Sequence, residues 1–288
     1  MKVTQHIERA SGKTLFSIEV LPPLKGDNIK SLFDNLDPLM EFKPPFVDVT
    51  YHREEYVFKK KPDGLLEKIS TRKRPGTVGI CAAIQNHYKV DTVPHIICGG
   101  FSKEETENAL IDLQFLGIDN VLVLQGDGIK NEGRFVPDPQ GHAYASELVT
   151  QVVNMNKGIY LDEDLTHPHP SDFCIGVAGY PEKHFAAPNL QSDLKYLKHK
   201  VDQGAEYIVT QMFFDNKKYY VLDFTHYQTK QKKMMAHIIY CDEQKEMYRV
   251  IAFPKMYTTA LGKMKAGSFC SPTVGQLDDG TKYVKDIA

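Results

Sequence analysis

The sequence has no paired cysteines, no long apolar run and no excess of either charge. No uninterrupted apolar stretch approaches the ~20 residues needed to cross a bilayer, and the first residues lack the apolar core of a signal peptide. The cysteines are odd in number and form no CxxC pair, so reduced thiols fit better than a disulfide framework or a zinc site. We therefore expect a cytoplasmic protein with no membrane partner. The cysteines are Cys81, Cys98, Cys174, Cys241 and Cys270.

Familiar binding motifs are also missing. Lys and Arg total 35 against 37 for Asp and Glu, a net charge of −2, so no global field favours nucleic acid. There is no GxGxxG after a strand, no GxxxxGK[ST] and no HExxH, which excludes Rossmann, P-loop and zincin sites. His167 and His169 could ligate a metal, but they flank prolines in a polar loop, where solvated histidines are the commoner case. We predict no metal site.

What the sequence does contain is strand-like and helical segments in alternation. At 288 residues and 42% hydrophobic content, it is long enough for one barrel domain or two ordinary domains. Near-continuous apolar character is typical of parallel strands covered on both faces. The segments of this kind are residues 15–20, 46–51, 93–98, 120–124, 173–178 and 207–213.

Helical signals lie between these segments. Ser102 and Glu105 have the spacing of a capping box, and they open a predicted helix over residues 104–116 that Gly117 ends. A second predicted helix covers residues 193–203 and ends at Gly204. Strand, helix and strand in alternation indicate an α/β fold with a parallel sheet.

Ionisable and polar side chains occur in or just after these predicted strands. In a parallel barrel, strand ends converge on one mouth, where barrel enzymes hold their chemistry. Each residue has a plainer interpretation: an edge-strand carboxylate for Glu19, a core histidine for His95, a turn for Asp127. It is their joint placement that predicts a site. The residues are Glu19, Thr50, His95, Gln125, Asp127, His184 and Gln211.

The same residues lie in motifs that resemble those of methylenetetrahydrofolate reductase, in the same order. The match runs from about residue 15 to residue 219, and the ordered set is specific although no single motif is. The motifs are FSIEVLPP (16–23), VDVTY (47–51), PHIIC (94–98), LQGD (124–127), YASEL (144–148), AGYPEKH (178–184) and TQMFFD (210–215).

This resemblance implies a (β/α)₈ TIM barrel that binds FAD without a Rossmann motif. NADH or NADPH would reduce the flavin, and the flavin would pass hydride to 5,10-methylenetetrahydrofolate. The product would be 5-methyltetrahydrofolate, a one-carbon donor for methionine biosynthesis. The implied partner is thus a folate small molecule.

The resemblance also assigns roles to residues. Glu19 takes the place of the general acid that helps open the folate ring to an iminium ion, and Asp127 that of the aspartate beside flavin and pterin. Gln211 corresponds to a folate-binding residue. At Gln125 many members have arginine. The implied flavin-binding positions are Thr50, His95, Gln125, Asp127, Tyr144, Ala145, His184, Asp193 and Lys200.

Physical reasoning supports some of these roles. A glutamate enclosed by apolar strand residues is desolvated, which favours the protonated form that a general acid needs. Asp193, at a predicted helix start, can accept N–H groups or bind a polar cofactor group. Lys200 is one of few cations able to reach a pyrophosphate at that face; without the resemblance, a solvated helix lysine is the simpler interpretation.

The matching motifs end near Tyr219. Residues 237–241 and 249–253 are strand-like but too close together for a crossover helix, so we expect a hairpin or irregular packing. Residues 263–288 show neither helical nor strand periodicity. We therefore predict an FAD-binding barrel domain over residues 1–220, incomplete or irregular after 220. A divergent segment over 221–288 would belong to the same domain if ordered.

Several alternatives are open. A frameshift, a mis-joined gene and a divergent C-terminal segment each predict this departure. The chain would then be a reductase, or a non-catalytic or truncated remnant that can still bind FAD. An unrelated barrel enzyme acting on a phosphorylated substrate is a third interpretation. The sequence does not decide between NADH and NADPH, or whether the chain forms a homo-oligomer.

Overall fold

The computed structural model describes residues 1–129 and 132–213 and, beyond them, the strands Thr225–Gln228, Met234–Cys241, Met247–Ala252, Pro272–Gln276 and Lys282–Ile287. Residues 214–219, which include the end of the last matching motif, lie outside the described residues, as does Phe253. The chain divides into two units. The first comprises Met1–Ala178 and Lys198–Val209, and the second Gly179–Leu197 and Thr210–Ala288.

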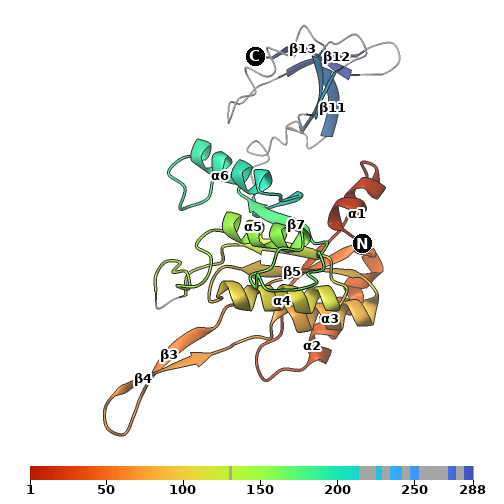
Figure 1. Ribbon diagram of the computed structural model, residues 1–288. Coiled ribbons are helices and arrows are strands. Elements are labelled where there is room, and N and C mark those ends of the chain that lie inside the picture. The colour runs from red at the N-terminus through yellow and green to blue at the C-terminus, as the bar shows by residue number, and fades with distance from the viewer. Residues whose placement is uncertain are drawn as a thin grey trace. The chain divides into compact units, whose positions relative to one another are not determined.

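A six-stranded sheet forms the centre of the first unit (Figure 1). Its strands lie in space in the order in which the chain makes them, with parallel pairing from β1 through β7. This is the order of a (β/α) barrel, and within the described residues the sheet stays open, with β1 and β8 at its edges. The protein is therefore an α/β protein with an incomplete barrel. The strands are β1 (Ile18–Val20), β2 (Phe46–Val49), β5 (Asp91–Ile97), β6 (Asn120–Leu124), β7 (Cys174–Gly179) and β8 (Tyr207–Thr210).

All six predicted strands are confirmed, with differences at their ends. The strand at 120–124 has the predicted bounds. The first strand begins at Ile18 rather than at residue 15, and the side chains of Leu15 and Phe16 before it are 36% and 49% exposed. The last ends at Thr210 rather than at residue 213.

Helices follow the strands as the alternation predicts. They are α2 (Ile29–Leu36), α3 (Thr77–Tyr88), α4 (Lys103–Phe115), α5 (Ala145–Asn156) and α6 (Leu190–Asp202), with the 3₁₀ helix η1 (Asp37–Phe42) after α2. The capping box of α4 is confirmed, since Ser102 and Glu105 each accept the other's backbone N–H. None of the helices in the described part of the chain has the length and apolarity that a bilayer crossing requires.

The helix predicted from residue 193 begins earlier, at Leu190. Asn189 explains the difference, because its side-chain oxygen accepts the N–H of Ser192, at 2.8 Å, as an N-cap does. Asp193 therefore lies in the first turn of α6.

Side chains on one face of the sheet pack into an apolar cluster that includes Val93, Leu122 and Cys174. Val3 of the N-terminal helix α1 (Val3–Ala10) joins this cluster, and its backbone N–H donates to Asn120 Oδ1 at 2.8 Å. The helix α1 thus closes the amino end of the strands, where Asn120 begins β6.

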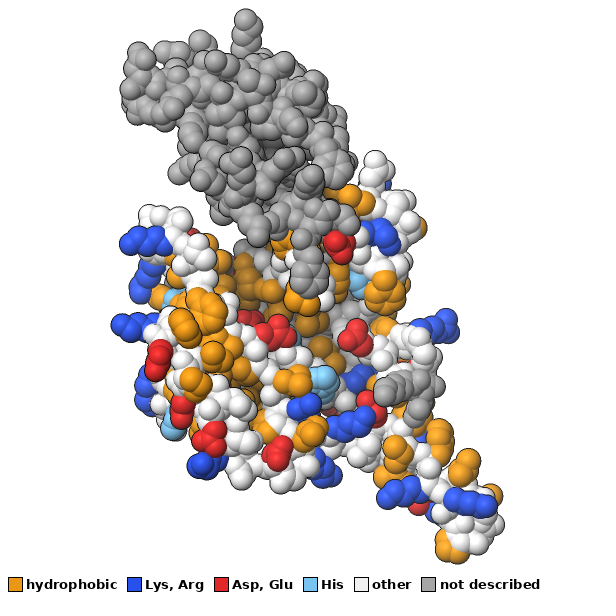
Figure 2. Space-filling view, turned by 180° about the vertical axis from the view of Figure 1, so that it is seen from behind, with side chains coloured by type: hydrophobic (Ala, Val, Ile, Leu, Met, Phe, Trp, Pro, Cys, Tyr) orange, Lys and Arg blue, Asp and Glu red, His pale blue; other side chains and the backbone are white. Residues whose placement is uncertain are grey.

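Two strands outside the barrel order form a hairpin that the sequence analysis did not predict, β3 (Glu55–Lys60) with β4 (Leu66–Thr71). Gly64 makes its turn, with a φ of +84° and an N–H that donates to Lys61 O at 3.0 Å. The hairpin extends from the sheet, and hydrophobic side chains are exposed along it, among them Phe58 and Leu66 (Figure 2). The turn sequence PDG between two strand-like runs was the available signal.

The second unit contains a five-stranded sheet in the order β12-β13-β11-β10-β9. Antiparallel pairing of β10 (Met234–Cys241) with β11 (Met247–Ala252) confirms the expected hairpin. Residues 263–288, whose sequence shows no strand periodicity, nevertheless contain two strands. Pro272–Gln276 (β12) and Lys282–Ile287 (β13) pair with each other, and the backbone hydrogen bonds of a paired strand form without regular side-chain alternation. The remaining strand is β9 (Thr225–Gln228).

Gly176 in β7 leaves the space that the Tyr207 ring occupies, since a Cβ at position 176 would overlap this ring. We predict that Gly176→Ala lowers the free energy of unfolding by about 1–3 kcal/mol, the usual cost of overpacking. Urea denaturation measures it. The matched control is Gly79→Ala in α3, where an added Cβ meets no atom within 4 Å. A loss at position 79 as large as that at 176 would contradict the explanation.

Candidate active site

Glu19 and Thr50 meet at the carboxyl ends of β1 and β2. The Thr50 hydroxyl donates to Glu19 Oε1 at 2.7 Å, and the Thr50 backbone N–H donates to Val20 O at 3.0 Å. The expectation that apolar neighbours enclose Glu19 is wrong: its side chain is exposed while Ile18 and Val20 are buried. β1 is an edge of the described sheet, with a strand beside it only on the β2 side.

The buried carboxyl group at this end of the sheet belongs to Asp48, a residue to which the sequence analysis gave no role. Asp48 stands opposite Glu19 in the β1–β2 register, and its side chain is 13% exposed. Burial, together with the nearby charge of Glu19, raises the pKa of Asp48 to about 7. The signal was available, because Asp48 interrupts an apolar strand between two valines, as Glu19 interrupts one between Ile18 and Val20.

His95 lies beside Asp48 on β5. Its side chain is 5% exposed, and its Nε2 is 3.9 Å from Asp48 Oδ1, too long for a hydrogen bond. Burial lowers the pKa of His95, partly offset by the charge of Glu19. Within the described residues, His95 Nε2 and the Tyr207 hydroxyl are buried without a hydrogen-bond partner.

The loop after β6 and the start of α5 bring other predicted residues together. The Gln125 side-chain amide donates to Ala143 O at 2.8 Å, which fastens the end of β6 to the residues before Tyr144 and Ala145. Tyr144 is 63% exposed, and Asp127 is also exposed, in the same loop. The side chain of Gln125 is therefore held by a hydrogen bond, whereas the side chains of Asp127 and Tyr144 are exposed to solvent.

Lys200 is not a solvated helix lysine. Its ammonium group is part-buried and donates to the backbone oxygen of Ala178, near the end of β7, at 2.5 Å. The lysine ammonium group thus lies near the carboxyl end of β7.

The remaining predicted residues belong to the second unit. Asp193 Oδ2 accepts the backbone N–H of His184 at 2.8 Å, so these two residues lie together. The ring of His184 packs edge-on against Tyr180, with centroids 4.6 Å apart. Gln211 has an exposed side chain, and its backbone N–H donates to Gly179 O at 2.8 Å.

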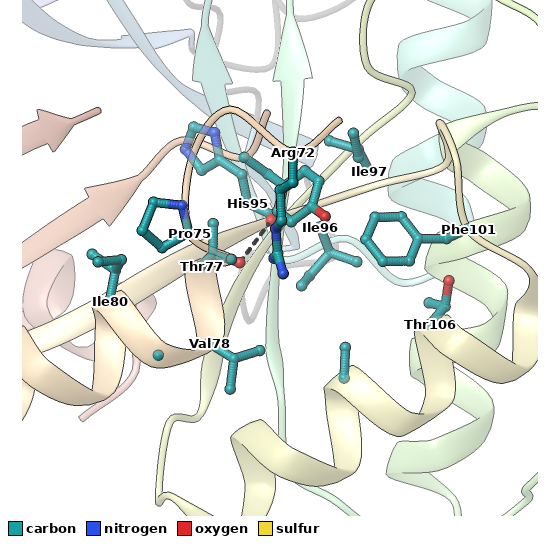
Figure 3. Close-up of a pocket in the computed structure, with 14 residues that line it drawn as sticks. Arg72, Pro75, Thr77, Val78, Ile80, His95, Ile96, Ile97, Phe101 and Thr106 are labelled. Carbon is teal, nitrogen blue, oxygen red and sulfur yellow. Dashed lines mark hydrogen bonds between the residues drawn. The ribbon is translucent and has the colours of Figure 1, made fainter. Parts of the chain in front are cut away.

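A cavity of about 340 Å³ lies on the helix side of the sheet, between the start of α3, β5 and the start of α4 (Figure 3). Ile80, Ile96 and Phe101 give it mainly apolar walls, and the Thr77 hydroxyl donates to His95 O at 3.4 Å at one side. Of the predicted site residues, only His95 contributes to its lining. The cavity therefore borders the predicted site at His95 and does not include its other residues.

The sequence pattern of the methylenetetrahydrofolate reductase family matches residues 2–257. This match continues past residue 219, where the motifs quoted above end. It covers most of the chain, including every predicted site residue.

Individual relatives agree with this match. The chain is 34% identical over 226 residues to "Methylenetetrahydrofolate reductase (NADH) 1" of Arabidopsis thaliana, covering 75% of this chain and 33% of that protein. It is 33% identical over 204 residues to "Methylenetetrahydrofolate reductase 1" of Schizosaccharomyces pombe, covering 70% and 29%. It is 30% identical over 217 residues to "5,10-methylenetetrahydrofolate reductase" of Escherichia coli, covering 75% and 61%. The match thus spans about a third of the first two relatives and under two thirds of the bacterial one.

The raised pKa of Asp48 gives a test of the site's electrostatics. Because the folded chain favours protonated Asp48, this stabilisation is complete below the ordinary pKa of 3.8 and is lost as the pH rises to about 7. We predict that Asp48→Asn, which is neutral throughout, gains stability relative to the wild type over this range, on the order of 4 kcal/mol, and that the gain levels off above it. Urea denaturation at a series of pH values measures it. A pH-independent difference would contradict the assignment.

Proposed function

The chain belongs to the methylenetetrahydrofolate reductase family, and we propose that it reduces 5,10-methylenetetrahydrofolate to 5-methyltetrahydrofolate with FAD as cofactor. The observation that carries the proposal is the placement of Glu19, the residue that matches the family's general acid. It stands at the carboxyl end of β1 with an exposed side chain that one hydrogen bond from Thr50 orients. A general acid needs this access to substrate.

Glu19 would act by proton transfer. Its carboxyl group gives a proton to a nitrogen of the folate's five-membered ring, the carbon–nitrogen bond breaks toward that nitrogen, and an iminium cation forms. The exposed carboxylate of Asp127 favours this cation by electrostatic attraction. Gln211 would hold the folate through its side-chain amide.

The residues at this end of the first unit fit a flavin nucleotide. Leu21 is 47% exposed and Tyr144 63% exposed, which offers apolar surface that a flat ring system would cover. Gly126 has a φ of +83°, and a Cβ there would come within 3.3 Å of Ile97. Both constraints favour a residue without a side chain at the turn before Asp127. When bound, FAD supplies hydride transfer between the nicotinamide donor and the folate.

We assign the flavin contacts as the resemblance implies. They are Thr50, His95, Gln125, Asp127, Tyr144, Ala145, His184, Asp193 and Lys200. Gln125 takes a position where many members have arginine, so its amide offers a hydrogen bond in place of a charge.

The electron donor we propose is NADH, because the Arabidopsis relative carries it in its name. The proposed setting is the cytoplasm, which keeps thiols reduced. Cys81, Cys98 and Cys174 are buried free thiols.

Purification of the full chain tests the proposal. We expect a yellow protein with flavin absorbance that NADH bleaches under anaerobic conditions and that methylenetetrahydrofolate reoxidises. Retained FAD without folate turnover would favour the non-catalytic alternative. Folded material without affinity for flavin would contradict the proposal.

Glu19→Gln separates the two halves of the reaction. The variant keeps the hydrogen bond from Thr50 but cannot donate a carboxyl proton. We predict that NADH still reduces the flavin at the wild-type rate, while folate reduction falls by a factor of at least 10², the lower range for loss of a general acid. Stopped-flow absorbance measures both half-reactions.

The matched control is Glu104→Gln, which removes an exposed carboxylate from α4. This variant should leave both half-reactions at the wild-type rate. Equal loss of both half-reactions in Glu19→Gln would contradict the role assigned to Glu19.

A further inference from the structure

We propose that the β3–β4 hairpin binds a second copy of this chain, by antiparallel pairing of β3 with the β3 of that copy across a two-fold axis at Val57. The two hairpins would then form one four-stranded sheet. This pairing uses none of the residues assigned to the reaction, so its tests need neither flavin nor folate.

The hairpin has an open edge along β3. This strand pairs with β4 on one side, and no other strand in the described part of the chain joins this sheet. Beside the turn, the Lys61 N–H donates to Leu65 O at 2.8 Å. Because hydrogen-bonded pairs alternate along an antiparallel ladder, the backbone groups of Phe58 and Lys60 point away from β4. A hairpin of two strands is marginally stable in water, and further strands stabilise it.

The sequence along this edge is complementary to itself in antiparallel order. Residues 54–60 read EEYVFKK, two acids and two lysines on either side of three apolar residues. A pairing centred on the middle residue sets aromatic rings opposite each other next to the axis and opposite charges beyond them, which are favourable cross-strand pairs. The two-fold axis repeats each pair. The opposed residues, one from each copy, are Val57 with Val57, Tyr56 with Phe58, Glu55 with Lys59, and Glu54 with Lys60.

Neighbouring registers lack this match. A pairing centred on Tyr56 sets Glu54 opposite Phe58 and brings no acid opposite a lysine. One centred on Phe58 retains a single charge pair, Glu55 opposite Lys61. The charges therefore favour the register centred on Val57 over its neighbours, as charge pairs do when they specify a partner.

The two lysines of this edge are available for a partner. Other lysines in or beside the hairpin already contact it: Lys61 pairs with Glu67, Lys73 with Glu55, and Lys68 lies over the Tyr56 ring. Within the described residues, Lys59 and Lys60 form no ion pair, and both are exposed. A carboxylate has two acceptor oxygens, so Glu55 can bind Lys73 and a lysine of the second copy together.

Apolar side chains are exposed along the same strand (Figure 2). Val57 is 41% exposed and Phe58 56% exposed. The rings of Tyr56 and Phe58 already pack edge to face, with centroids 5.6 Å apart. The two-fold axis would bring four rings together on one face of the sheet, and such aromatic pairs add to the stabilisation from burial.

Sedimentation of the full chain at a series of concentrations tests the association, and we expect a monomer–dimer equilibrium. Lys60 stands opposite Leu66 within its own hairpin, so Lys60→Glu leaves the hairpin's ion pairs in place. In this variant two like-charge contacts with Glu54 replace two attractive ones, and the Kd of the dimer should rise about tenfold. A chain that is monomeric at every concentration, or a variant with an unchanged Kd, would overturn the proposal.

Exchange of the two charges separates this pairing from a general effect of charge. Glu54→Lys alone should weaken the dimer, and the double variant Glu54→Lys/Lys60→Glu should recover the wild-type Kd. The matched control is Lys157→Glu, the same charge change at an exposed position after α5, which should leave the Kd unchanged. Circular dichroism verifies that each variant folds. Failure of the double variant to recover would contradict the pairing.

A disulfide tests the register directly. At the axis the two copies of Val57 would have Cα atoms about 4.5 Å apart, within the range of a disulfide. Val57→Cys should therefore form a covalent dimer with oxidised glutathione, seen by non-reducing electrophoresis above the background of the wild-type cysteines. Phe58→Cys is the control, because residue 58 is more exposed but its two copies would lie about 8 Å apart, too far to bridge. Equal crosslinking of both variants, or none in Val57→Cys, would overturn the proposal.

Discussion

Parallel pairing of successive strands is the constraint on which the first unit depends. A tight turn cannot join two parallel strands. The chain must therefore cross over one face of the sheet, back to its amino end, before each new strand begins. That return makes the helices from α2 to α6 and sets the carboxyl ends of the strands side by side. Glu19, Thr50 and Gln125 come from strands far apart in sequence, yet they lie at one end of one sheet for this reason.

Inside the sheet, buried polar groups lie level with apolar ones. Asp48 is paired with Val93, and His95 with Leu122, and both of these apolar partners belong to the packed cluster. The absence of a side chain at Gly176 leaves room for the Tyr207 ring. The apolar cluster contributes hydrophobic stabilisation, while the side chains of Asp48 and His95 beside it are polar groups whose burial costs free energy.

The parallel sheet and its helices could be predicted from the sequence because their signals are local. The capping box at Ser102 and the apolar run at 120–124 each fix an element without reference to the rest of the chain. The burial of a side chain is not a local property, because it depends on how many strands lie beside the residue. An apolar stretch around Glu19 therefore predicted burial, whereas the edge position of β1 exposes that side chain and the next strand buries Asp48. The pairing of β12 with β13 likewise depends on partners distant from any one window of sequence.

The link between Val3 and Asn120 has a consequence for water. Val3 of α1 packs on the cluster of Val93, Leu122 and Cys174. The helix therefore covers the amino end of the sheet and keeps water away from that end. Water therefore does not reach Asp48 and His95 through the end that α1 covers. A molecule that covered the Asp48 side chain, which is 13% exposed, would isolate this acid from bulk water.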